Sequence, residues 1–175
     1  MTHPIFARLD DQLREVEAEL RNLRNSDARS RKLKETNPSL YNGWTHRSAI
    51  AEGIRSVYTG LESIMKAIAD EIDLYEAPRS DNWHEKLIDQ MAVGIDGVRD
   101  AVLSPDTRAM LHELRRFRHV VHHNYAQRLE TAKVLENRER VEKAFSAFKR
   151  DYAHLSKALQ GHRVKRARGR PLKRS

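Results

Sequence analysis

The sequence predicts an all-α protein whose amphipathic helices pack as an antiparallel bundle. Its 175 residues include only seven glycines and five prolines, fewer turn-forming residues than a β-sandwich or barrel needs. Apolar residues recur at intervals of three and four, which places them on one face of a helix. No segment alternates apolar and polar residues as a half-buried strand does, so we expect helices throughout the folded part.

The first helix is predicted from Pro4 to Asn25. Its apolar face is made of residues spaced three or four apart, namely Ile5, Leu9, Leu13, Val16, Leu20 and Leu23. The polar segment 26–39 interrupts this spacing, and Pro38 within it disfavours a helical conformation for the preceding residue. We therefore expect an extra N-terminal helix and a linker over residues 1–40.

Two further helices are predicted over about 45–74 and over 83–103. Gly53 and Gly60 lie on the first of these, where the absence of a side chain would let another helix come close. The helix over 83–103 contains two glycines, which weaken it by about 1 kcal/mol each relative to alanine.

The fourth helix has a clear start, with Ser104 as the N-cap, Pro105 at the first helical position and an aspartate in the first turn. Asn124 is a suitable residue for its end. The last helix is predicted from about Thr131 to Leu159. The four helices predicted after residue 40 form the main domain, which is predicted over residues 41–160.

The positive charge of the chain is concentrated in a C-terminal tail. Seven of the 33 basic residues and none of the 25 acidic residues lie in the last fourteen positions. The rest of the chain therefore holds 26 basic and 25 acidic residues, a net charge of +1 against +8 for the whole. We expect the tail, residues 161–175, to be disordered because it lacks enough apolar surface to fold.

The absence of cysteine excludes disulfides, a thiol nucleophile and thiolate metal ligands. No apolar run approaches the ~20 residues of a membrane span, and the N-terminus lacks the apolar core of a signal peptide. We expect a cytoplasmic protein that does not bind a membrane.

The stretch RRFRHVVHHNY combines three arginines and three histidines between Arg115 and His123. One interpretation is that these cations complement the dipole at a helix C-terminus. A second is a metal site, since His119 and His123 stand four residues apart, but the neighbouring arginines would repel a dication. The third is a phosphate site, because histidine exchanges protons near neutral pH and the planar guanidinium of arginine matches two phosphate oxygens. The first and third remain open on the residues alone.

A helical wheel sorts these side chains. Arg118 and His122 share one flank of the apolar stripe, whereas His119 and His123 point away from the core. A two-fold dimer would bring two copies of this face together and concentrate arginine and imidazole in one cleft.

Residues 118–125 resemble the Arg-(polar)-x-x-x-His-x-Tyr signature of HEPN domains, specifically of the HepT-like ribonuclease toxins. The resemblance also covers the helical layout from about Thr45 to Leu159. It implies a HEPN-like bundle that forms a homodimer, in which the facing motifs build a composite endoribonuclease site without a metal or other cofactor. It further implies a place in a toxin–antitoxin or defence system.

Carried over residue by residue, the resemblance makes Arg118 the residue that holds the scissile phosphate and His123 the acid–base residue. His119 occupies the polar position, where the family usually has asparagine or aspartate. Tyr125 matches the tyrosine that a partner nucleotidyltransferase antitoxin adenylylates in some of these systems. His122 is an alternative acid–base residue, because on one helix it neighbours Arg118, whereas His123 is ~140° away.

Arg115 and Arg116 either contact phosphates of the RNA or pair with nearby acids such as Glu113, and both interpretations stay open on the sequence. Arg166, Arg168 and Arg170 in the tail are expected to contact RNA. The Arg-Gly-Arg-Pro run of the tail looks like the core of an AT-hook, so a DNA contact is an alternative to a general polyelectrolyte role. For the whole protein, the alternative is a HEPN-like module that binds RNA or nucleotide, or serves as an assembly subunit, without cutting.

Overall fold

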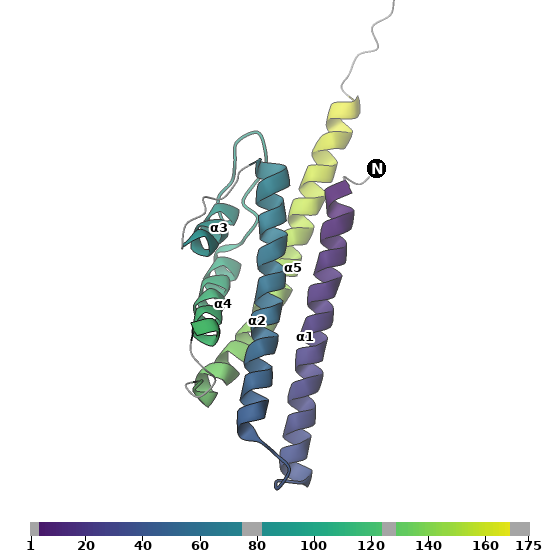
Figure 1. Cartoon of the computed structure of the whole chain (residues 1–175). Coiled ribbons are helices and arrows are strands. Elements are labelled where there is room, and N and C mark those ends of the chain that lie inside the picture. Colours follow the sequence, from purple (N-terminus) through teal and green to yellow (C-terminus); the bar gives the residue numbers. More distant parts are fainter. Residues whose placement is uncertain (1–3, 75–81, 124–128, 169–175) are drawn as a thin grey trace, which may run out of the picture.

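The computed structural model describes residues 4–74, 82–123 and 129–168. They form five α-helices and a π-helical turn, in the order α1 (Pro4–Thr36), α2 (Gly43–Ile68), η1 (Ala69–Asp73), α3 (Trp83–Met91), α4 (Pro105–His123) and α5 (Thr131–Arg168). The long helices α1, α2, α4 and α5 run alternately down and up the bundle, and the short α3 lies beside α4 (Figure 1). The predicted all-α antiparallel bundle is confirmed.

All five helices contribute to one hydrophobic core. Each helix has at least one side chain that is almost completely buried there, for example Leu9, Ile64, Ile88, Leu114 and Phe148 in chain order. The N-terminal helix therefore packs on the same core as the rest of the bundle. The domain boundary near residue 40 stays a prediction.

The first helix is longer than the sequence predicted, because α1 continues through the polar segment to Thr36. Asp27, in the expected break, is 4% exposed. It accepts hydrogen bonds from Arg31 one turn later and lies 3.0 Å from Nε2 of His46 on α2. A paired carboxylate can be buried where a lone one cannot, so the polar segment stays helical and packs on α2. The break comes after Thr36, where Pro38 stands.

The two glycines of α2 face α1 directly, as predicted. A Cβ atom at Gly53 would lie 2.8 Å from Cδ1 of Leu23, and one at Gly60 would overlap Cγ2 of Val16. The absence of a side chain at both positions lets the two helices pack closely, and Gly60 has the tighter contact.

The helix predicted over 83–103 is wrong in its second half, because α3 ends at Met91. Gly97 adopts a φ of 72°, in the left-handed region that favours glycine. The backbones of Ile95 and Arg99 pair with each other across this turn, with N–O distances of 2.8 and 3.0 Å. Glycine, which weakens a helix, fits this turn without strain.

A buried ion pair holds the turn in place. The Arg99 and Asp73 side chains are both 0% exposed, and Nε of the arginine lies 2.6 Å from Oδ1 of the aspartate. Arg99 also donates to the carbonyl oxygens of Val93 and Asp100. This ion pair therefore holds the end of η1 against the segment that follows α3.

The start of α4 is confirmed. The Ser104 hydroxyl accepts a hydrogen bond from the backbone N–H of Thr107 at 3.3 Å, and α4 begins at Pro105. The last helix, α5, continues beyond the predicted Leu159 to Arg168, since this part of the sequence is rich in arginine and lysine, which are good helix formers.

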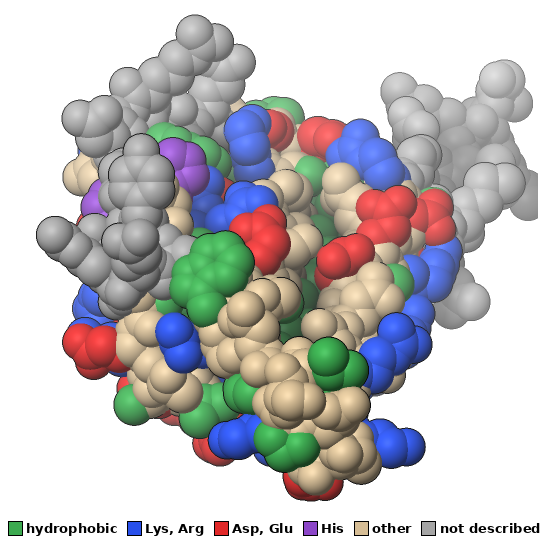
Figure 2. Space-filling model, turned by 60° about the horizontal axis from the view of Figure 1, so that its bottom comes forward, with side chains coloured by type: hydrophobic (Ala, Val, Ile, Leu, Met, Phe, Trp, Pro, Cys, Tyr) green, Lys and Arg blue, Asp and Glu red, His purple; other side chains and the backbone are tan. Residues whose placement is uncertain are grey.

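The end of the bundle where α1 joins α2 exposes apolar side chains. Leu40 is 67% and Trp44 51% exposed, and hydrophobic side chains lie there among charged ones (Figure 2). Over the described ranges, none of the helices has the length and apolar character that crossing a membrane requires.

Candidate functional site

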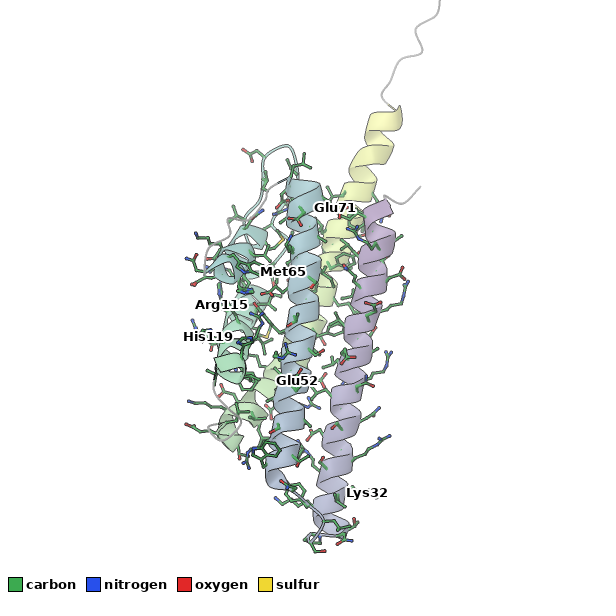
Figure 3. The ribbon with its side chains drawn as sticks, in the orientation of Figure 1. Lys32, Glu52, Met65, Glu71, Arg115 and His119 are labelled. Atoms are coloured by element: carbon green, nitrogen blue, oxygen red, sulfur yellow. The ribbon has the colours of Figure 1, made fainter. Side chains whose placement is uncertain are left out.

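The arginine–histidine stretch lies in the last turns of α4. Arg115 and Arg118 are half-buried, whereas Arg116, His119 and His122 are exposed. Arg115 and His119, one turn apart, both project from α4 (Figure 3). The exposure of His119 agrees with the helical wheel, which points it away from the core.

Arg118 is connected to two other helices through His84. Its Nη1 atom lies 3.3 Å from Nε2 of His84 on α3. On the other side of the ring, Nδ1 of His84 lies 2.5 Å from Oε1 of Glu62 on α2. The same carboxylate oxygen accepts a hydrogen bond from the Tyr58 hydroxyl at 3.1 Å. A continuous row of polar contacts therefore joins α2, α3 and α4.

This row is built partly inside the core. Tyr58 is completely buried and Glu62 is 5% exposed, while the side chain of His84 is 21% exposed. The ring of Trp83 packs against that of His84, tilted by 32° and with a centroid distance of 3.7 Å. The imidazole is thus restrained on three sides, by an indole, a carboxylate and a guanidinium.

The electrostatic environment keeps Tyr58 a hydrogen-bond donor. Burial raises the pKa of its hydroxyl well above the usual value, and the charge and hydrogen bond of Glu62 raise it further. The guanidinium groups of Arg118 and Arg115 act in the opposite direction but do not outweigh these effects. Tyr58 therefore keeps its proton and donates a hydrogen bond to the Glu62 carboxylate.

The other two arginines of the stretch pair with acids. Arg115 lies with Nη2 3.3 Å from Oε2 of Glu85 on α3, and Arg116 pairs with Glu113 one turn earlier on α4. The half-buried pair of Arg115 ties α4 to α3. The pair of Arg116 is solvent-exposed, and such pairs contribute little to stability.

Arg115 and Arg118 share a further property. The Nε atom of each is buried and has no hydrogen-bond partner among the described residues. A buried donor without a partner is costly, and hydrogen bonds between a guanidinium and an anionic oxygen are among the strongest in proteins. Both Nε atoms are shielded from solvent, so an anion would reach these two arginines through their outer nitrogens.

Several predicted site residues cannot be placed. The backbone of His123 belongs to α4, and those of Arg166 and Arg168 belong to α5, but their side chains lie outside the described residues. Tyr125 and Arg170 lie wholly outside them. The predicted pairing of Arg118 with His123 stays a prediction.

Sequence reasoning missed His84, Glu62 and Tyr58. A weak signal was present for two of them, because Glu62 follows Tyr58 by one helical turn on the buried stripe of α2, where an isolated acid needs a partner. Nothing in the sequence pairs either of them with His84. Among the side chains that the structure describes, there is no group of three or more histidines, aspartates or glutamates that could hold a metal ion.

Comparison with known protein families identifies a relationship for most of the bundle. The family described as HepT-like protein matches residues 49–159, which is more than half of the chain. This range includes α3, α4, most of α2 and all the contacts of Arg118 described above. No curated protein and no solved structure matches the chain significantly.

Proposed function

Because the chain belongs to the HepT-like family, we propose that it is a metal-independent endoribonuclease of the toxin type, acting on RNA in the cytoplasm. The observation that carries the proposal is the setting of Arg118. This arginine is half-buried, is connected to α3 and α2 through His84, and lies beside the exposed histidines of α4. A positioned cation next to groups that exchange protons suits phosphodiester cleavage.

The proposed reaction needs no water and no redox partner. A base takes the proton of the 2′-hydroxyl, and the 2′-oxygen attacks the neighbouring phosphorus. The bond to the 5′-oxygen breaks as an acid protonates that oxygen, which leaves a cyclic phosphate and a 5′-hydroxyl. His123 is the proposed acid–base residue, with His122 as the alternative. Arg118 stabilises the charge that develops on the phosphate oxygens.

We assign the polar position of the motif to His119, which is exposed on α4 and can contact the substrate. A second copy of the chain completes the site in this proposal. Arg118 and His123 lie ~140° apart around one ideal helix, so a single α4 would not direct both at one phosphate. A two-fold dimer places the histidine of one subunit opposite the arginine of the other.

The remaining basic residues are proposed to hold the rest of the RNA. Arg116 is exposed on α4, and Arg115 lies beside it with a buried Nε atom. The basic C-terminal segment, with Arg166, Arg168 and Arg170, would add affinity without sequence preference. The proposed partner protein is a nucleotidyltransferase antitoxin that modifies Tyr125.

The test is cleavage of total RNA by the purified full chain in excess chelator. Arg118→Ala should lower the cleavage rate on the order of 10²–10³-fold, the usual cost of removing a group that stabilises the developing charge. His123→Ala should abolish cleavage, whereas His122→Ala should leave most of it. Arg108→Ala is the matched control, because Arg108 lies on α4 but pairs with Asp89, away from the site.

Two outcomes would contradict the proposal. Cleavage that persists in Arg118→Ala would remove the arginine from the chemistry, and RNA binding without any cleavage would favour the binding-module alternative. The composite site has its own test. Mixing the Arg118→Ala and His123→Ala variants should restore part of the activity, because one site of each mixed dimer then holds both wild-type side chains. No recovery would mean that both groups act within one subunit.

A further inference from the structure

His84 lies outside the arginine–histidine stretch but makes the contact that connects Arg118 to the rest of the fold. A guanidinium only donates hydrogen bonds, so the Nε2 atom of His84, 3.3 Å from Nη1 of Arg118, must accept. The hydrogen of the ring then resides on Nδ1, which faces Glu62 at 2.5 Å. Both contacts are satisfied by this one tautomer.

The opposite tautomer would break both contacts. A hydrogen on Nε2 would point at the N–H groups of Arg118, and a bare Nδ1 would face the Glu62 carboxylate, so acceptor would meet acceptor. Glu62 therefore selects the tautomer, as a carboxylate does for an imidazole in many active sites. Its own orientation is set by the buried Tyr58 hydroxyl.

The surroundings restrain the ring as well as its hydrogen. Trp83 packs against the ring of His84, and Glu62 is 5% exposed, so neither the ring nor the carboxylate can easily turn away. A rotation of the ring would also deprive the buried carboxylate of its contact with His84 and leave it with the Tyr58 hydroxyl, and losing a hydrogen bond in the interior is costly. The Nε2 acceptor is thus held at a fixed place beside α4.

We propose that His84 is a positioning residue, oriented by Glu62, whose Nε2 atom fixes the direction of the Arg118 guanidinium toward the scissile phosphate. The inference rests on the proposed function, because it concerns how that arginine is aimed. Arginine has a long and flexible side chain, so its ordering costs free energy. A guanidinium that is already oriented in the free protein avoids this cost when the transition state forms.

Two substitutions of His84 distinguish the role of its Nδ1 contact with Glu62 from the role of its Nε2 contact with Arg118. The amide of asparagine falls near the place of Nδ1, so His84→Asn keeps a donor for Glu62 but no acceptor for Arg118. The amide of glutamine reaches the place of Nε2, so His84→Gln offers its carbonyl oxygen to Arg118. His112→Asn is the matched control, since His112 on α4 also contacts a carboxylate, at 2.9 Å from Oδ1 of Asp89, and this contact does not involve Arg118.

The expected results are changes in kcat. His84→Asn should lower kcat on the order of 10–10²-fold, the usual cost of losing a group that orients a functional residue, with little change in KM. His84→Gln should recover most of that loss, and His112→Asn should behave as wild type. Equal activities of the asparagine and glutamine variants, at equal melting temperatures, would overturn the inference while leaving the nuclease proposal intact.

A measurement that does not depend on RNA cleavage tests the role of His84 separately from the proposed nuclease activity. The ¹⁵N chemical shifts of the His84 ring report which nitrogen carries the hydrogen. We expect it on Nδ1 in the wild-type protein, and a shift of the Nε2 resonance in Arg118→Ala. A hydrogen found on Nε2, or an Nε2 resonance that is unchanged by that substitution, would show that His84 does not hold the arginine, whether or not the protein cuts RNA.

Discussion

Replacing Gly60 by alanine tests whether α1 is an integral part of the fold. The family match begins at residue 49, so α1 lies outside it, yet the Cβ of an alanine at this position would overlap Cγ2 of Val16 on α1. Valine has two heavy atoms on Cβ and few alternative rotamers. The clash therefore has to be relieved by moving one helix away from the other.

The magnitude follows from two opposing effects. An extra methyl group forced into a packed core costs about 1–3 kcal/mol, whereas alanine favours a helix over glycine by ~1 kcal/mol. Because Val16 cannot yield easily, we expect the upper part of this range and a net destabilisation of about 1–2 kcal/mol. Gly53→Ala is the comparison, since its nearest neighbour is the end of the flexible Leu23 side chain, and there the two effects should nearly cancel.

The assay is thermal and urea unfolding of four proteins: wild type, Gly60→Ala, Val16→Ala and the double variant. In the Val16→Ala background the second substitution should be neutral or stabilising, a coupling of about 1 kcal/mol or more. If Gly60→Ala costs the same in both backgrounds, or costs nothing in the wild-type protein, α1 does not pack on α2 as described.

Two further predictions concern acid and salt. Hydrogen bonds from Arg31 and His46, against the effect of burial, lower the pKa of Asp27 from its ordinary 3.8. Its contribution to stability is therefore complete above ~pH 5 and lost as the pH falls below ~4, so Asp27→Asn should flatten the acid side of the melting temperature plotted against pH; an unchanged slope would contradict this. Removal of residues 162–175 should weaken RNA binding and reduce its dependence on salt, and an unchanged salt slope would exclude a role for the tail.

Much of the fold was predictable because the apolar stripes of the long helices are regular, and Ser104 marks the start of α4. The errors arose where polar residues are stabilised from a distance. The segment around Asp27 looked like a linker because its partner His46 comes nineteen residues later. The helix after Met91 was overestimated because periodicity continued across glycines that form a turn.

The candidate site was predictable only in part, for the same reason. Residues 115–123 are adjacent in sequence, so their concentration of charge was visible. The contact of Arg118 with His84 spans 34 positions, and that of His84 with Glu62 spans 22. Such contacts depend on how three helices are arranged, which helical periodicity does not specify.

The ion pair between Arg99 and Asp73 limits how this sequence can diverge. Both side chains are wholly shielded from solvent, and a substitution of either alone would strand an opposite charge in the interior, at a cost of about 3–5 kcal/mol. A substitution at one of the two positions is therefore tolerated only together with a matching change at the other. We expect the two positions to covary among related sequences. Gln90 on α3 donates a hydrogen bond to the same aspartate. The ion pair therefore also helps to fix the position of α3, the short helix that carries His84.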